Sequence, residues 1–131
     1  MSENQAKESF EDFANALKRL QEALNEPESN ILAIDGTIQR FEFTFELLWK
    51  TFRRTLLIEG IETNTPKEAL RKAYEARWID DETLWLNVLK DRNETSHTYD
   101  ETKARQIYSH IKDYMPELNK CRDLLKQRFK K

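Results

Sequence analysis

The side chains best suited to chemistry gather in one polar stretch, residues 91–100, which reads DRNETSHTYD. Arg92 offers a planar fork of donors that matches two phosphate oxygens. His97 can accept or donate a proton near neutral pH, and the hydroxyl of Tyr99 is a donor, an acceptor and a candidate nucleophile. Together these residue types are suited to binding a phosphate group or to reacting with one.

The spacing of these residues decides whether they can act together. Seven residues return to nearly the same face of a continuous helix, so Arg92 and Tyr99 would align there. His97 would lie well round from Arg92, because five residues make about 1.4 turns. A break in the helix within the stretch would let the three side chains converge.

A purely structural interpretation of the stretch stays open, and the spacing alone favours it. Thr98 and Glu101 are spaced as a capping box, in which two side chains satisfy free amides at the start of a helix. Asn93 and Ser96 are ordinary residues for a helix end or a turn. On this interpretation, the stretch only connects two helices.

The rest of the chain predicts helices that would hold this stretch. Apolar residues recur at intervals of three and four along five segments. The segments are residues 5–25, 30–59, 66–77, one that starts after Asp80 or Asp81 and ends near Arg92, and one that begins at Asp100 and Glu101. This pattern predicts an all-α protein: an up-and-down bundle of four long helices plus a short helix, in a single domain over residues 1–131.

Individual positions within these helices carry further expectations. Residues 65–68 form a capping box at the start of the short helix. Tyr74 is expected on the inward face of that helix. Gly60 is a natural stop for the helix before it. Pro116 should kink the last helix, since proline lacks an amide for the ladder and clashes one turn back. His110 is expected to be a partly exposed helix histidine and not a ligand.

The second predicted helix is apolar over most of its circumference. Phe43, Leu47, Trp49 and Leu57 widen its stripe well beyond one face. A helix of this kind is buried from several sides, and a bundle of this size would leave Phe43, Leu47 or Trp49 partly uncovered. We therefore expect a two-fold symmetric homodimer that buries part of this helix.

Composition narrows the function classes. The 131 residues include two glycines, three prolines and one cysteine, 35% of them are charged, and the net charge is −2. One cysteine excludes an internal disulfide, and no apolar run is long enough to cross a membrane, so we expect a soluble cytoplasmic protein. No HExxH, CxxC or glycine-rich phosphate loop occurs, which leaves a metal site or a cofactor unsupported.

Taken together, these features resemble a known family. The motif R-x4-H-x-Y, made by Arg92, His97 and Tyr99 between the last two predicted helices, is similar to that of the HEPN superfamily. Residues 92–101, RNETSHTYDE, and residues 41–60, FEFTFELLWKTFRRTLLIEG, resemble more narrowly the HepT-like nucleotidyltransferase substrate-binding proteins. These are small helical proteins that pair with a separate, minimal nucleotidyltransferase. The resemblance covers nearly the whole chain.

Three functions stay open under this resemblance. The first is a substrate-binding or partner subunit of a two-component nucleotidyltransferase system, in which Arg92 holds phosphate and Asn93, Ser96 and Tyr99 meet a substrate or nucleotide. The chain lacks the Gly-Ser and paired aspartates of a nucleotidyltransferase, so it would not be the catalytic subunit. The second is a metal-free HEPN-type ribonuclease, the toxin of a toxin–antitoxin pair. In that function Arg92 and His97 would act on RNA, and the addition of AMP to Tyr99 would regulate the activity. The third is a non-catalytic helical adaptor.

Overall fold

The protein is built from helices alone across the residues that its computed structural model describes, 2–130. The elements are α1 (Ser2–Leu24), α2 (Ile31–Ile58), α3 (Pro66–Glu75), α4 (Glu82–Glu94), the 3-10 turn η1 (Thr95–His97) and α5 (Glu101–Arg128). The all-α prediction is confirmed. None of these helices is long and apolar enough to cross a membrane.

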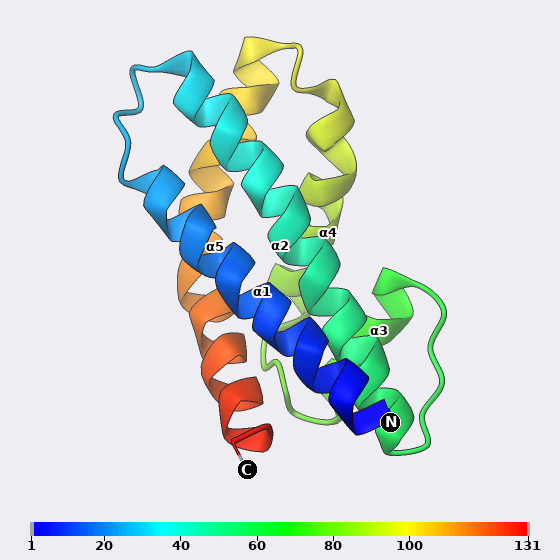
Figure 1. Ribbon diagram of the computed structural model, residues 1–131. Coiled ribbons are helices and arrows are strands. Elements are labelled where there is room, and N and C mark those ends of the chain that lie inside the picture. The colour runs from blue at the N-terminus through cyan, green and yellow to red at the C-terminus, as the bar shows by residue number, and fades with distance from the viewer. Residues whose placement is uncertain (1, 131) are drawn as a thin grey trace.

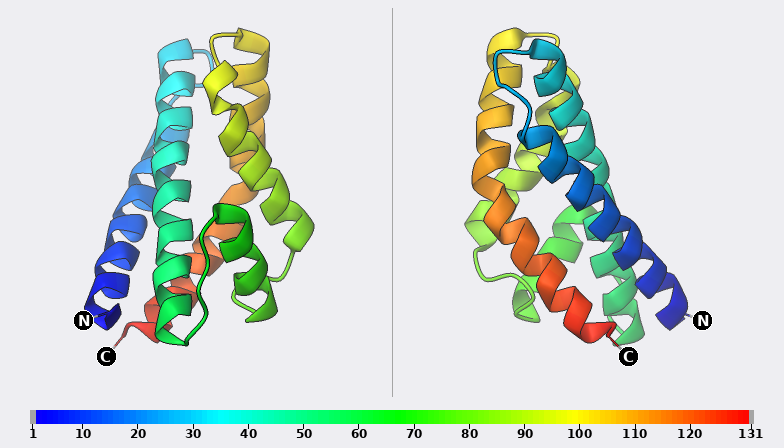
Figure 2. Two further views of the ribbon diagram at one scale, coloured as in Figure 1. Left: turned by 90° about the vertical axis from the view of Figure 1, so that its right-hand side faces the viewer. Right: turned by 60° about the vertical axis from the view of Figure 1, so that its left-hand side comes forward.

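The helices run up and down with short connections between them. α1 and α2 form an antiparallel pair along their whole length, and α5 packs against both (Figure 1). α3 and α4 cover the other side of α2 in two shorter pieces (Figure 2). Both chain ends lie at one end of the molecule, and η1 lies at the opposite end. The polar stretch is therefore displayed at the tip of the bundle.

The core is aromatic and centred on α2. Its largest fully buried side chains include Phe13, Phe41, Phe45, Phe52 and Trp85. α2 is also the only described helix with a series of buried threonines, each of which donates its hydroxyl to the carbonyl four residues before it at 2.7 Å: Thr37, Thr44, Thr51 and Thr55. These bonds satisfy polar groups that have no water nearby. The predicted burial of α2 from several sides is thus present within one chain.

Local signals set the helix ends much as the sequence indicated. After α2, Gly60 has a φ of 82°, and the amide of Ile61 donates to the carbonyl of Leu56 at 2.9 Å, as in a Schellman motif. At the start of α3, Thr65 accepts from the amide of Glu68, as the capping box predicted. α5 stays one helix through Pro116, and its axis changes direction along its length (Figure 2).

One expectation about a single side chain needs correction. Tyr74 is 41% exposed and does not face the core. Ala69, Leu70 and Ala73 already fill the inward face of the ten-residue α3, and the next position is rotated by about 100°. The expectation that Phe43, Leu47 or Trp49 would be partly uncovered is met by Phe43, which is 54% exposed, while Trp49 is buried.

Candidate functional site

The polar stretch ends one helix and begins the next. α4 continues into the 3-10 turn Thr95–His97, and Asp100 then caps α5. Thr95 donates its hydroxyl to the carbonyl of Arg92 at 2.7 Å, and Thr98 donates to the carbonyl of Thr95 at 3.0 Å. These hydroxyls satisfy carbonyls that the end of a helix leaves without partners. The helix is therefore broken within the stretch, and we call residues 95–100 the motif turn.

The capping box expected at Thr98 and Glu101 is wrong. The N-cap of α5 is Asp100, whose carboxylate accepts from the amides of Thr102 and Lys103 at 2.9 and 3.4 Å. The hydroxyl of Thr98 is directed back to the preceding turn, so it cannot serve α5. A carboxylate beside the positive end of the helix dipole is a favourable cap.

Arg92 is held against α2 and not against the other motif residues. Its Nη2 donates to Oε1 of Glu46 at 2.7 Å, and its Nη1 lies 3.4 Å from Oδ1 of Asn93. The Arg92 side chain is 36% exposed and that of Glu46 is 33% exposed. An ion pair with this exposure contributes about 1 kcal/mol or less, so a phosphate can compete with Glu46 for the guanidinium.

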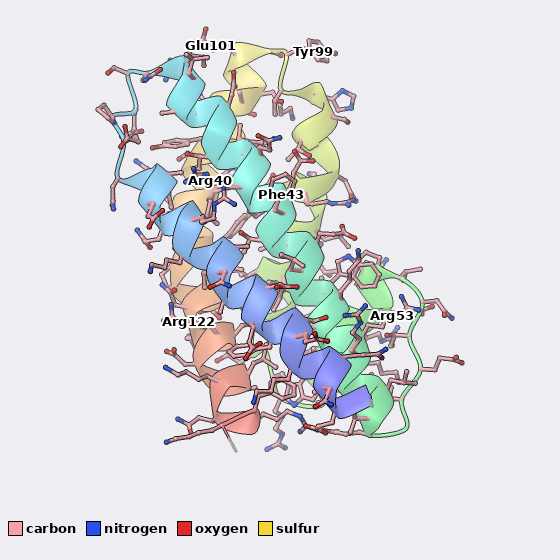
Figure 3. All side chains as sticks on the ribbon, in the orientation of Figure 1. Arg40, Phe43, Arg53, Tyr99, Glu101 and Arg122 are labelled. Carbon is pink, nitrogen blue, oxygen red and sulfur yellow. The ribbon has the colours of Figure 1, made fainter. Side chains whose placement is uncertain are left out.

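His97 and Tyr99 form the exposed part of the motif. Their ring centroids are 6.2 Å apart at an interplanar angle of 73°, and Nε2 of His97 lies 3.9 Å from Oε2 of Glu94. Tyr99 is 87% exposed and projects from the tip of the molecule (Figure 3). A modifying enzyme or a ligand can therefore reach the phenol without displacing other side chains.

The structure thus brings together only part of the predicted set. The break in the helix places His97 beside Tyr99, while Arg92 stays with Glu46 and Asn93. Asn93, which precedes the motif turn, and Ser96, which belongs to it, are both exposed. Sequence reasoning missed Glu46, which lies 46 residues before Arg92 in the chain and also pairs with Lys50 one turn further along α2, at 3.6 Å.

A groove between α4 and α5 lies on the inner side of the same stretch. It has a volume of about 460 Å³, and its polar walls include Lys90, Asp91, Glu94, Lys103, His110 and Tyr114. Residues 91 and 94 belong both to this groove and to the polar stretch that carries the motif. We call this feature the α4–α5 groove.

The wall of the groove contains a buried carboxylate with two partners on α5. Oδ2 of Asp91 lies 2.9 Å from Nδ1 of His110 and also accepts from the hydroxyl of Tyr114. The side chain of Asp91 is only 12% exposed. Burial, and then the hydrogen bond to Asp91, raise the pKa of the Tyr114 phenol well above its ordinary value. Two donors thus offset the cost of burying this charge.

The sequence held a signal for this cluster. Trp85, Val88 and Asp91 follow one another at intervals of three, and all three are buried, so Asp91 extends the apolar stripe of α4. His110 and Tyr114 are four apart and therefore share one face of α5. The expectation of a partly exposed His110 is right, since its side chain is 52% exposed, but its pairing with Asp91 was not foreseen.

No metal site is evident in the part of the chain that the structure describes. Within residues 2–130, no three His, Cys, Asp or Glu side chains are grouped closely enough to hold an ion. The side chains that the site does contain are imidazoles, a guanidinium, phenols and carboxylates. This set can bind a phosphate and move protons.

Comparison with known proteins gives a related sequence and solved structures of similar fold. The chain is 38% identical over 100 residues to a Haemophilus influenzae protein named probable ribonuclease HepT, in a match that covers 72% of this chain and 68% of the relative. A crystal structure of a Thermus thermophilus protein matches with a TM-score of 0.80 and 33% identity, over 91% of this chain and 99% of that one.

A second solved structure and a family model lead to the same group. A Haemophilus influenzae structure, described as revealing the fold of a substrate binding domain of a nucleotidyltransferase, matches with a TM-score of 0.69 and 29% identity. That match spans 95% of this chain and 98% of the other. The model of the family "Nucleotidyltransferase substrate binding protein like" matches residues 8–127, nearly the entire length. The chain belongs to this family of nucleotidyltransferase substrate binding proteins.

Proposed function

We propose that this protein is a metal-free ribonuclease of the HepT type, the toxin of a toxin–antitoxin pair. The observation that carries the proposal is the identity of 38% to a protein named probable ribonuclease HepT, over 72% of this chain. The exposed imidazole of His97 at the tip of the bundle supports it, since RNA can reach that group. This function was the alternative drawn from the sequence, and the named relative now favours it over a purely substrate-binding role.

The reaction requires a base for the 2′-hydroxyl of RNA and a positive group for the phosphorane-like transition state. His97 is suited to the first task, and Arg92 to the second. Arg92 must first exchange Glu46 for a phosphate oxygen, and the exposure of this ion pair makes that exchange easy. Asn93 is exposed beside the motif turn and Ser96 is exposed within it, so both can donate to the sugar–phosphate backbone.

A cleavage assay with single variants tests this proposal. His97→Ala and Arg92→Ala should each lower the rate at which the purified protein cleaves oligoribonucleotides by at least ~100-fold, the usual value of a proton-transfer residue or an oxyanion donor. Arg122→Ala is the charge-matched control, because Arg122 lies on the flank of α5 away from the motif turn (Figure 3). Cleavage that survives both site variants, or that falls equally in the control, would refute the assignment.

The family match favours a second role, as the partner subunit of a minimal nucleotidyltransferase. The two roles are compatible if the partner enzyme transfers AMP from ATP to the exposed phenol of Tyr99 and releases pyrophosphate. The added bulk and negative charge beside His97 would then keep RNA away from the motif turn. The same surface would serve catalysis and its control.

Peptide mapping tests the modification. The protein is incubated with its cognate nucleotidyltransferase, ATP and magnesium, and we expect the mass of AMP on the peptide that holds Tyr99. Tyr74 is the internal control, because it is 41% exposed but does not follow the motif. AMP on Tyr74 or on no residue, while the enzyme modifies a control substrate, would contradict the proposal.

We also propose that two copies form a dimer through α2. Phe43 is 54% exposed and faces outward from the middle of α2 (Figure 3), and Leu57 on the same helix is 51% exposed. Large apolar side chains left bare on a central helix are characteristic of an interface. Sedimentation at tens of micromolar should show a dimer for the native chain and a monomer for Phe43→Glu. A native chain that sediments as a monomer would contradict this proposal.

A further inference from the structure

The α4–α5 groove holds a histidine that the proposed function does not use. An ionised carboxylate only accepts hydrogen bonds, so Nδ1 of His110 must carry the proton that Asp91 accepts. This bond fixes the ring and leaves Nε2 as the nitrogen available to the groove, which His110 lines. An Asp–His pair of this kind holds an imidazole ready to give or take a proton at Nε2.

The same groove connects His110 with the motif. Asp91 and Glu94 are one turn apart on α4, with their Cβ atoms about 5–6 Å apart, as in any pair three residues apart. Asp91 holds His110, while Glu94 lies 3.9 Å from His97. The His110 imidazole is therefore hydrogen-bonded to Asp91, and the His97 imidazole lies near Glu94, the next carboxylate on the same helix face.

The dimensions of the groove fit a short piece of nucleic acid. A volume of about 460 Å³ lies within the usual range for a small-molecule or nucleotide site. Lys90 and Lys103 line it and can meet phosphate oxygens, whereas Glu94 and Asp113 oppose them. The groove therefore does not attract anions by its net charge. Its suitability for a phosphodiester comes from the position of the proton donor His110 in its lining.

We propose that His110 is the general acid of the ribonuclease reaction and that Asp91 is its positioning residue. This proposal rests on the ribonuclease function proposed above. His97 removes the proton of the 2′-hydroxyl, the 2′-oxygen forms a bond to phosphorus, and the bond between phosphorus and the 5′-oxygen breaks. The imidazolium of His110 gives its Nε2 proton to the departing 5′-oxygen. The products are a 2′,3′-cyclic phosphate and a 5′-hydroxyl, and His110 is left neutral with its proton on Nδ1.

A substrate with a better leaving group tests this role. The bond that the native protein cleaves is mapped first, and the oligoribonucleotide is then made again with sulfur in place of the 5′-oxygen at that bond. A thiolate departs without a proton, so a missing general acid should no longer matter. His110→Ala should slow cleavage of the ordinary RNA by about 10²–10⁴-fold and should cleave the sulfur-containing RNA at nearly the native rate.

Other variants separate this role from a structural one. His97→Ala should stay slow on both substrates, because the base is still required. Asp91→Asn should slow the ordinary RNA less than His110→Ala does, and the sulfur substrate should restore its rate as well. Lys112→Ala, on the same helix, is the control that should cleave both substrates normally. If His110→Ala does not fold, His110→Gln is measured on the same two substrates to test whether His110 protonates the leaving group.

The outcomes distinguish the two proposals. A native protein that cleaves no RNA would overturn both the ribonuclease function and the role of His110. Native cleavage with an unaffected His110→Ala would overturn only the role of His110. A loss in His110→Ala that is equally large on the sulfur substrate would also overturn it, because the residue would then act by some means other than protonating the leaving group.

Discussion

Asp91 and Arg92 are neighbours in sequence, yet they belong to two different regions of the molecule. Successive residues of a helix point about 100° apart, so Asp91 faces α5 and Arg92 faces α2. The side chain of Asp91 is 12% exposed, whereas those of Arg92 and His97 are 36% and 56% exposed. The inner region is a hydrogen-bonded cluster within the bundle, and the outer region is a set of ion pairs and rings in contact with water.

This difference has a physical consequence for function. A buried carboxylate with two donors holds its partners in one geometry, since any rearrangement would leave a charge or a hydroxyl without a hydrogen bond. The exposed pair of Arg92 and Glu46 can exchange with water or phosphate at little cost. The inner region can therefore orient a proton donor, while the outer region can accept a ligand or a partner enzyme.

The largest difference in stability should come from replacing the two neighbours themselves. Asp91→Ala leaves the buried Tyr114 hydroxyl without its acceptor and should lower the free energy of unfolding by about 2–3 kcal/mol. Arg92→Ala removes only a half-exposed ion pair and should lower it by less than about 1 kcal/mol. Urea unfolding of the two variants measures this directly. Equal losses would show that burial does not separate the two regions.

Tyr114→Phe tests the inner region alone. It removes one hydrogen bond to a charged acceptor, while His110 stays with Asp91, and should cost about 1.5 kcal/mol near pH 7. The raised pKa of Tyr114 stabilises the folded protein below the ordinary phenol pKa of about 10, and this contribution is lost as the pH rises further. The difference between native protein and variant should therefore shrink above about pH 10.

The control for this measurement is the alkaline behaviour of the variant itself. Burial also raises the pKa of Cys121, so some loss of stability above about pH 9 should remain in Tyr114→Phe. A variant whose stability falls with pH as steeply as that of the native protein would show that Tyr114 does not contribute.

The helices could be predicted from the sequence because the patterns that indicate them are local. The apolar intervals, Gly60 and the cap at Thr65 all act within a few residues, and they indicated the elements and most of their ends. The expected start of α5 at Asp100 and Glu101 is correct, but the sequence also offered a capping box at Thr98. Thr98 and Asp100 are both good caps, and only the geometry of the turn selects between them.

Only part of the site could be predicted from the sequence, because its important contacts join residues that are distant in sequence. The motif identified Arg92, His97 and Tyr99 by residue type. The partners of Arg92 and Asp91 lie 46, 19 and 23 residues away, and the direction of each contact depends on how three helices are rotated. Local spacing cannot supply that rotation.

Glu46→Gln tests how freely the outer region exchanges its partners. The amide keeps the shape of Glu46 but lacks its charge, so Arg92 is released for phosphate at a cost in stability below about 1 kcal/mol. Binding of an oligoribonucleotide to the His97→Ala background should tighten by up to about 5-fold, the equivalent of that same energy. Fluorescence anisotropy measures the affinity, with Glu62→Gln as a charge-matched control at an exposed loop. Weaker or unchanged binding would mean that Glu46 does not compete for Arg92.

The smallest expected effect comes from Tyr99→Phe, the chemical counterpart of Tyr114→Phe. Both changes remove one phenolic oxygen, but Tyr99 is 87% exposed and its hydroxyl is free to meet water. The free energy of unfolding should therefore change by less than about 0.5 kcal/mol, as for most surface substitutions. The same variant should lose AMP addition entirely, because no phenol is left to accept the group. A loss of stability as large as that of Tyr114→Phe would mean that the outer region is held as firmly as the inner one.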